Sequence, residues 1–312
     1  MKDVGHLPGR RRFGWYVPKP GGAMDLKIDA RPIDATIWSE FRQYTRVVEL
    51  LRPYMVDYLA LSEDYAAFER TEVEIGEALS RQLATAMITI PAGVDANAEA
   101  QRRIGNFLGA ASAFRDRSKT RLLGQFGKQG VEPAAFEAAT NHWFDTSFAY
   151  RCLCQLRNFA QHHELPISFV PINADRMADG VMAARIGLQL YPATLAASSR
   201  VNKKVRTELL TLGSGPLDLT ALAVDYRKAH DGLMALVLGF YTPALKQMAH
   251  YAAAVFQRFE IPEGAVPVIW EGDDPAGGPG TQRRAIMMGF DEMLRAFALR
   301  EKLNQTTSKS EN

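Results

Sequence analysis

Hydrophobic residues recur every three or four positions over most of this chain, which is the spacing of an amphipathic α-helix. Pro53 and Pro243 are expected to break or kink their helices, because proline lacks the amide donor of the helical ladder. Three long helices between residues 62 and 166, joined by short Gly/Pro turns, predict an up-and-down bundle, so the expected fold class is mainly α. The predicted helices cover residues 36–52, 62–90, 95–126, 132–165, 201–212, 217–259 and the stretch from 286 onward.

Two stretches depart from the helical period. Residues 1–35 are rich in glycine, proline and arginine, which predicts an irregular arm with room for one short strand. Residues 167–172 have the composition of a strand, and residues 182–190 fit a second strand or a short helix, of which we predict the strand. Together they predict a small β insertion directly after the helix that ends near Pro166.

These patterns predict three parts along the chain. An irregular N-terminal arm covers residues 1–35, and a helical domain with the β insertion near 167–191 covers residues 36–265. A linker, a C-terminal helix and a frayed tail cover residues 266–312. The linker contains the glycine-rich stretch 272–280, which has no Gly-Lys-Ser/Thr sequence and therefore does not predict a phosphate-binding loop.

Charge and composition narrow the class of protein. The 312 residues carry a net charge of +2, with 47% hydrophobic and 23% charged residues, so any basic surface must be local. The N-terminus lacks the apolar segment of a signal peptide, and no run is long enough to span a bilayer. Cys152 and Cys154 are two apart on a predicted helix, so they point to different faces and do not form a CxxC pair. Reduced thiols and a cytoplasmic location are expected.

The candidate catalytic residues lie near the end of the predicted helix 132–165, where its apolar pattern stops. Arg157, Asn158 and His162 follow one another there. Arginine binds phosphate with two donors, histidine exchanges protons near neutral pH, and asparagine can orient either group. Residues five apart on a straight helix are about 140° apart around its axis, so Arg157 and His162 converge only if the helix ends early or a dimer pairs two sites. The alternative reading is structural, because cations stabilise helix C-termini.

The segment resembles the RX4–6H motif of the HEPN superfamily, in which an arginine, commonly followed by a polar residue, precedes a histidine late in a long helix. Arg157, Asn158 and His162 match that order, and His163 matches the longer spacing. The run from Tyr150 to Asn158 also resembles such proteins. The resemblance covers residues 62–166 and leaves 1–60 and 200–312 unexplained.

The resemblance implies a HEPN-like bundle that acts as a metal-independent endoribonuclease, usually a homodimer and often paired with a protein partner such as an antitoxin. It implies that His162 acts as general acid or base, that Arg157 stabilises charge on the scissile phosphate, and that Asn158 orients His162 or the phosphate. One toxin subgroup has a tyrosine where this chain has Glu164. Two alternatives stay open: a non-catalytic interaction module, and binding of a nucleotide-like ligand in the same pocket.

Other residues are weaker candidates. Arg115 and Lys119 belong to a charged run that is usually a solvated face but could contact phosphate, and we assign them with His163 to substrate binding. The arm residues 10–16 mix arginines with aromatic rings, which suits single-stranded RNA, although a strand edge is the commoner use. No histidine or cysteine spacing predicts a metal site, and no cofactor is expected. The expected partner is RNA, with no membrane.

Overall fold

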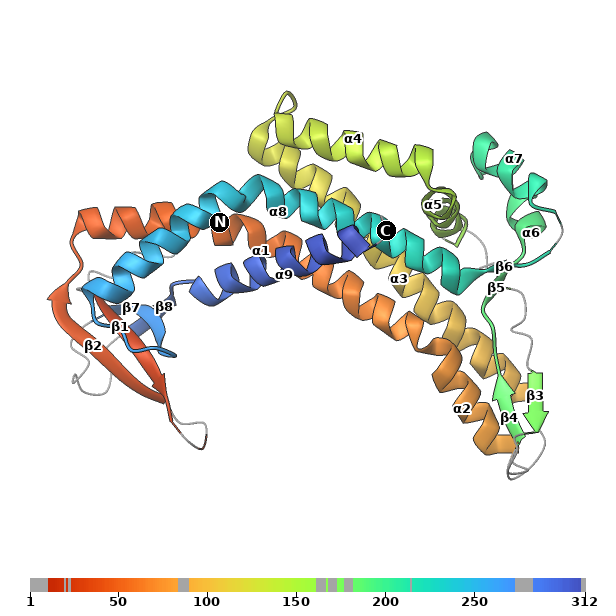
Figure 1. The fold of residues 1–312 in the computed structure, drawn as a ribbon, viewed down its shortest axis with the longest axis horizontal. Coiled ribbons are helices and arrows are strands. Elements are labelled where there is room, and N and C mark those ends of the chain that lie inside the picture. Colours follow the sequence, from red (N-terminus) through yellow and green to blue (C-terminus); the bar gives the residue numbers. More distant parts are fainter. Residues whose placement is uncertain are drawn as a thin grey trace. The chain divides into compact units, whose positions relative to one another are not determined.

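The computed structural model describes residues 11–19, 21, 24–83, 90–160, 167, 173–176, 182–213, 215–272 and 283–309. The chain is mainly helical and divides into two compact units, each built from two separate stretches of sequence (Figure 1). We call Met1–Pro53 with Leu238–Gln305 the sheet unit, and Tyr54–Val237 with Thr306–Asn312 the helical unit. The helices α1 (Ala35–Glu69) and α8 (Leu219–Arg258) contribute to both units, and so do the last residues of α9 (Phe290–Lys309).

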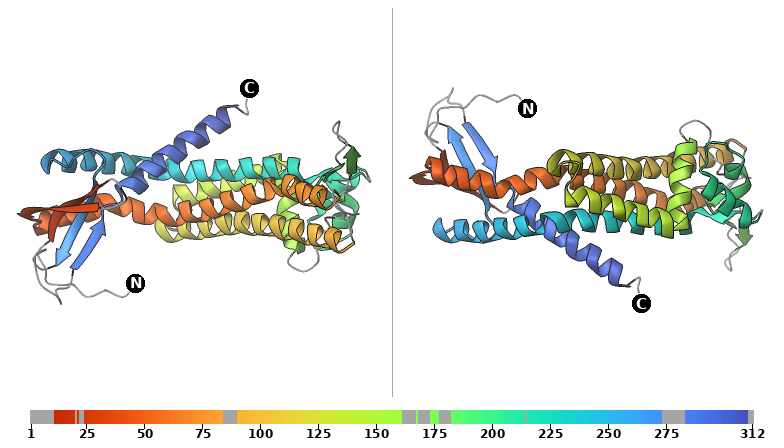
Figure 2. Two further views of the ribbon diagram at one scale, coloured as in Figure 1. Left: turned by 90° about the horizontal axis from the view of Figure 1, so that it is seen from below. Right: turned by 90° about the horizontal axis from the view of Figure 1, so that it is seen from above.

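The helical unit contains most of the helices. Figure 2 shows α1, α3 and α8 running side by side within it. Its short strands form two small antiparallel pairs, β3–β4 and β5–β6. Besides its parts of α1 and α8, the elements are α2 (Thr71–Leu83), α3 (Ile90–Phe126), α4 (Val131–Thr146), α5 (Phe148–Ala160), β3 (Asn173–Arg176), β4 (Met182–Arg185), β5 (Gln189–Leu190), α6 (Pro192–Ala196), α7 (Lys203–Thr211) and β6 (Leu217–Asp218).

Aromatic rings fill the centre of the helical unit. Phe107 of α3 is fully buried, and its ring contacts Phe68 of α1 and Tyr226 of α8 at centroid distances of 5.9 and 5.8 Å. Phe114, two turns further along α3, contacts Tyr58 of α1 at 5.7 Å. These rings bury large apolar areas in one place, so three helices share a single core.

Partly buried polar contacts surround this aromatic core. Tyr58 donates a hydrogen bond of 2.6 Å to Asp231, and Arg227 donates one of 2.7 Å to the Tyr58 hydroxyl. Asp57 of α1 accepts hydrogen bonds from both Arg117 and Arg121 of α3. Because each contact joins two different helices, the pairs specify how α1, α3 and α8 align in the helical unit.

The sheet unit is built on four antiparallel strands in the order β2-β1-β7-β8. Phe13 pairs in register with Ile269 and packs its ring 4.1 Å from that of Phe259. On the same strand, Arg11 forms an ion pair with Glu271 and stacks over the ring of Trp38. The elements of this unit, besides its parts of α1 and α8, are β1 (Arg11–Pro18), β2 (Met24–Pro32), β7 (Val266–Gly272), β8 (Arg283–Met287) and α9 (Phe290–Lys309).

Several predicted helices are confirmed, but three are not, namely 36–52, 62–90 and 132–165. The predicted helix 62–90 is interrupted at Arg70, because α1 ends at Glu69 and α2 begins at Thr71. The predicted helices 95–126, 201–212 and 217–259 are confirmed as α3, α7 and α8. The predicted break between residues 52 and 62 is wrong, because α1 continues through Pro53 to Glu69. Ser62 does not begin a helix; inside α1 its hydroxyl donates to the Tyr58 carbonyl at 2.8 Å. A proline loses one helical hydrogen bond, and the buried residues on both sides of Pro53 keep the helix intact.

The predicted helix 132–165 is also wrong as a single element. It forms α4 and α5, separated at Ser147, whose backbone is extended with φ −102° and ψ 115°. The Ser147 hydroxyl accepts a hydrogen bond of 3.1 Å from the amide of Tyr150, which makes it the N-cap of α5. Serine competes with helical hydrogen bonding in this way, so the break is local in origin.

The strand predictions need correction at both ends of the chain. The expected irregular arm contains β1 and β2, and the expected linker contains β7 and β8 with Ile286 inside a strand. The β insertion is present as the β3–β4 pair, and β4 and β5 lie in the predicted strand 182–190. Ile167 is not in a strand, and residues 168–172 lie outside the described residues, as does the predicted loop 273–280. Across the described ranges, no helix has the length and apolar character needed to cross a bilayer.

Candidate functional site

The short helix α5 carries the sequence-predicted motif. Its first two turns are buried nearly all round, and the buried residues are Ala149, Tyr150, Arg151, Cys152, Leu153, Cys154 and Leu156. In the last turn, Arg157 is half-buried and Asn158 is exposed.

Arg151 anchors the start of α5. One guanidinium nitrogen donates to the carbonyl oxygens of Phe144 and Asp145 at 2.7 and 2.8 Å, which satisfies the last turn of α4. The rest of the guanidinium makes two hydrogen bonds to Glu208 of α7, at 2.9 and 3.0 Å. A single buried side chain therefore joins α4, α5 and α7, a role that the periodicity did not indicate.

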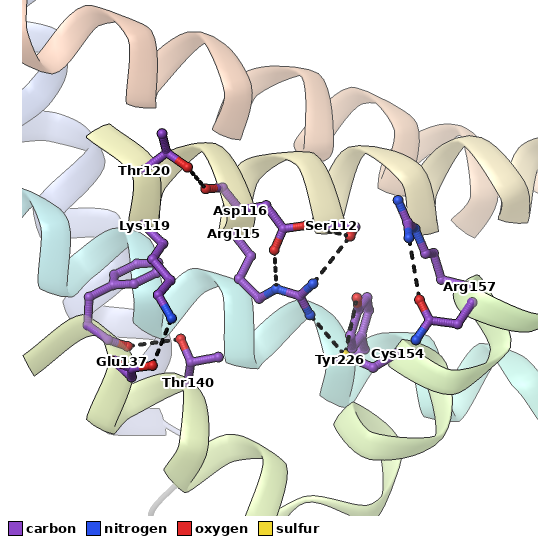
Figure 3. Close-up of polar contacts among 12 residues, drawn as sticks. Ser112, Arg115, Asp116, Lys119, Thr120, Glu137, Thr140, Cys154, Arg157 and Tyr226 are labelled. Atoms are coloured by element: carbon purple, nitrogen blue, oxygen red, sulfur yellow. Dashed lines mark hydrogen bonds and ion pairs between the residues drawn. The ribbon is translucent and has the colours of Figure 1, made fainter. Parts of the chain in front are cut away.

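Arg157 lies in the last turn of α5 (Figure 3), next to Asn158 in the sequence. The Arg157 guanidinium donates a hydrogen bond of 3.4 Å to the Asn158 side-chain oxygen. Two of the three predicted catalytic residues, which are neighbours in the sequence, are therefore linked through their side chains. His162 and His163 lie outside the described residues, so the convergence of Arg157 with His162 stays a prediction.

Arg115 of α3 reaches the same part of α5. Its guanidinium donates to Asp116 at 2.9 Å, to Ser112 at 3.4 Å and to the sulfur of Cys154 at 3.4 Å (Figure 3). Cys154 precedes Arg157 by three residues and Asn158 by four, so all three lie on one side of α5. Arg115 was expected to bind substrate, and the structure places it one helical turn from the Arg157–Asn158 pair.

Lys119, the other residue expected to bind substrate, lies one turn further along α3. Its ammonium forms an ion pair of 2.7 Å with Glu137 of α4, and both side chains are about half exposed. Figure 3 shows this pair on the far side of Arg115 from Arg157. Lys119 is therefore near the motif only through Arg115, and a carboxylate already balances its charge.

A group of polar side chains next to this site is fully buried, and the sequence pattern did not reveal it. Tyr150, Tyr226 and His230 are at most 1% exposed, and their rings contact one another. The Tyr150 hydroxyl and His230 Nε2 have no hydrogen-bond partner among the described residues. Burial raises the pKa of both tyrosines. In the sequence, an isolated histidine or tyrosine is indistinguishable from an ordinary core residue. The cluster is recognised only in the tertiary structure, where the three rings are in contact.

His230 predicts a specific pH dependence of stability. Burial lowers its pKa to about 4, while Nδ1 lies 2.9 Å from the Tyr226 carbonyl oxygen and must carry the single proton of the neutral ring. In the unfolded chain the histidine has a pKa of about 6.5, so below that pH the unfolded state takes up the proton first. We expect this site to lower the free energy of unfolding by about 2 kcal/mol between pH 7 and pH 5. Urea denaturation at both pH values measures it.

A matched pair of variants isolates this contribution. His230→Gln keeps a donor for the Tyr226 carbonyl and is expected to remove the pH-dependent part. His142→Gln, at an exposed position, should leave it unchanged. An equal pH dependence in wild type and His230→Gln would show that His230 does not titrate in this way.

The two cysteines are free and buried, as expected from their spacing. Burial raises the pKa of the Cys152 thiol to about 12 and also raises that of Cys154, even though Arg115 opposes the second effect. A thiol with a raised pKa is a poor nucleophile at neutral pH. Cys154 therefore serves as a packing and hydrogen-bonding group in this site, with its sulfur 3.9 Å from the Tyr226 hydroxyl.

The described residues contain no cluster of histidine, cysteine, aspartate and glutamate that could hold a metal ion. Comparison with known proteins adds no relative: no family model matches this chain, and no similar curated protein or solved structure is found. The chemistry of the site therefore has to be argued from its own residues.

Proposed function

We propose that this protein binds RNA and cleaves it without a metal ion, at the C-terminal end of α5. The observation that carries the proposal is the Arg157–Asn158 pair, with its side chains 3.4 Å apart in the last turn of α5, five and four residues before His162. We also propose that the helical unit is a HEPN-like bundle and that the protein acts as a homodimer in the cytosol. The two free thiols fit such a reducing compartment.

In this proposal each residue has a separate task. His162 removes the proton of the ribose 2′-hydroxyl as it attacks the neighbouring phosphorus, and a proton is returned to the leaving 5′-oxygen. Arg157 stabilises the extra negative charge of the phosphate in the transition state. Asn158 holds the Arg157 guanidinium through its side-chain oxygen. The 2′-hydroxyl is the nucleophile, so DNA cannot be a substrate.

Incubation with single-stranded RNA in EDTA tests the proposal. Wild-type protein is expected to cleave, and His162→Ala and Arg157→Ala are each expected to lower the rate by at least about 100-fold. Gel analysis of end-labelled RNA measures the rates. Arg81→Ala serves as a matched loss of one exposed arginine elsewhere on the helical unit, and it should cleave as fast as wild type.

Two results would contradict the proposal. One is cleavage of a 2′-deoxy oligonucleotide of the same sequence as fast as the RNA is cleaved. The other is cleavage that persists in His162→Ala, which would point to a contaminating nuclease. Folding of each variant is checked by its thermal unfolding curve, so that loss of activity is not loss of structure.

A second function, a non-catalytic interaction module, is favoured by one observation. Arg115 and Lys119, the cations nearest the motif on α3, already form ion pairs with Asp116 and Glu137. Cations whose charge a carboxylate already balances have less need of a phosphate partner, and the Lys119–Glu137 pair also joins α3 to α4. Absence of cleavage by a folded wild-type protein, together with capture of a specific protein partner such as an antitoxin, would favour the module.

A further inference from the structure

A basic segment adjoins the candidate site and was not part of the sequence motif. Four cations fall within seven residues at the start of α7 and in the turn before it: Arg200, Lys203, Lys204 and Arg206. The first three are exposed, whereas Arg206 is half-buried. Four positive charges in so short a stretch form a strong local field, even though the whole chain carries only +2.

Three polar contacts hold this segment against α4 and α5. Glu208 of α7 accepts the two hydrogen bonds from Arg151 described above. Lys204 forms an ion pair of 3.3 Å with Asp145 at the end of α4. The amide of Asn202 donates a hydrogen bond of 3.0 Å to the side-chain oxygen of Gln155. The last contact lies closest to the motif, because Gln155 precedes Asn158 by three residues on α5.

The four cations are not equally available. Lys204 is paired with Asp145, and Arg206 donates to the carbonyl oxygens of Ser199 and Val201 at 3.2 Å. Arg206 thereby fixes the turn that precedes α7. Within the part of the chain that the structure describes, no carboxylate forms an ion pair with Arg200 or Lys203. Two exposed cations are thus left on a turn that two other cations hold in place.

The neighbours of these two cations favour nucleic acid over protein as the partner. Ser199, Asn202 and Thr207 are exposed beside them, and hydroxyl and amide groups together with lysine and arginine make most contacts to phosphates. Protein interfaces instead centre on large apolar or aromatic side chains. The exposed leucines of α7, Leu210 and Leu212, lie at its other end, about two turns from Lys203.

We propose that Arg200 and Lys203 bind the phosphates of a single-stranded RNA next to the nucleotide at Arg157 and Asn158. This basic turn holds the RNA backbone while the end of α5 contacts the phosphate to be cleaved. The inference rests on the proposed function for its choice of RNA. It assigns binding, not chemistry, to α7, so the two can fail separately.

Fluorescence anisotropy with a labelled single-stranded RNA tests the surface. The His162→Ala protein is used throughout so that the RNA stays intact. Adding Arg200→Ala and Lys203→Ala is expected to reduce the slope of log affinity against log salt by about 1.4, since each lost contact to a single strand removes about 0.7. If both proteins bind equally at 1 M salt, the same relation predicts roughly 25-fold weaker binding at 0.1 M salt.

Arg81→Ala with Lys128→Ala is the matched control, because both are exposed cations of the helical unit and the net charge changes equally. This control should bind as the parent does. Equal weakening by the two double variants, or no weakening by Arg200→Ala with Lys203→Ala, would overturn the surface. Failure of the His162→Ala parent to bind RNA at low salt would overturn it too, and binding of polyglutamate instead would assign it to an acidic protein.

Cleavage measurements then separate the surface from the proposed reaction. With His162 restored, the Arg200→Ala/Lys203→Ala protein is expected to cleave at an unchanged rate when RNA is saturating and more slowly when RNA is dilute. Salt-dependent binding through α7 without cleavage by wild type would retain the surface and reject the nuclease. Cleavage that is insensitive to the double variant at every RNA concentration would retain the nuclease and reject the surface.

Discussion

Replacing Phe107 with alanine is expected to lower the free energy of unfolding by about 4 kcal/mol, within the range for truncating a fully buried phenylalanine. Phe107 has no exposed surface, and its ring lies between those of Phe68, Tyr65 and Tyr226 at centroid distances of 5.9, 5.3 and 5.8 Å. Alanine would remove all three ring contacts and leave a cavity where α1, α3 and α8 meet. Urea denaturation followed by circular dichroism measures the change.

Two variants separate the cavity from a general intolerance of substitution in these helices. Phe107→Leu keeps most of the volume and is expected to cost less than half as much. Leu210→Ala removes a leucine that is 63% exposed and is expected to change stability by less than about 0.5 kcal/mol. If Phe107→Ala cost less than about 1 kcal/mol, the three rings would not form the shared core described above.

Replacing Arg151 with alanine is expected to cost about 3 kcal/mol, which is the lower end for breaking a buried ion pair. The loss leaves the carbonyls of Phe144 and Asp145 without their donor and removes both hydrogen bonds to Glu208. Because Glu208 is 30% exposed and can regain water, the expected loss in the free energy of unfolding is smaller than for a fully buried partner. Chemical denaturation gives the free energy.

Substitutions of Arg151 and of Glu208 separate the stabilising effect of the two carbonyl hydrogen bonds from that of the two hydrogen bonds to Glu208. Glu208→Gln is expected to cost less than Arg151→Ala, because it leaves the two carbonyl hydrogen bonds of α4 in place. Arg151→Lys keeps the charge but cannot form the two-pronged contact, so an intermediate loss is expected. Equal stability of Arg151→Ala and wild type would mean that α4, α5 and α7 are held together without this side chain.

The same contact bears on the proposed function. Arg151 lies on α5 with Gln155 and Asn158, which follow at four- and three-residue steps, so loosening it disturbs both α7 and the end of the motif helix. If α5 and α7 share the RNA-binding site, we expect Arg151→Lys to bind RNA more weakly than wild type at a temperature where the variant stays folded.

The long helices could be read from the sequence because their cause is local. The apolar period of residues 95–126 and 217–259 predicts α3 and α8, since a helix satisfies its own hydrogen bonds and needs only one apolar side to be placed. The same reasoning failed at Pro53 and at Ser147. Buried neighbours keep α1 continuous at the proline, and the cap of Ser147 together with Arg151 ends α4.

Local periodicity predicts the mainly helical class, the helices α3, α7 and α8, and the place of Arg157 and Asn158 near the end of a helix. The remaining features depend on long-range packing, because they join residues far apart in the chain. β1 pairs with β7 about 250 residues later, and a strand finds its partner through backbone hydrogen bonds that leave no local period. Arg115 meets Cys154, and α7 meets Gln155, for the same reason. Contacts of this kind depend on packing between distant segments, which no local pattern in the sequence reveals.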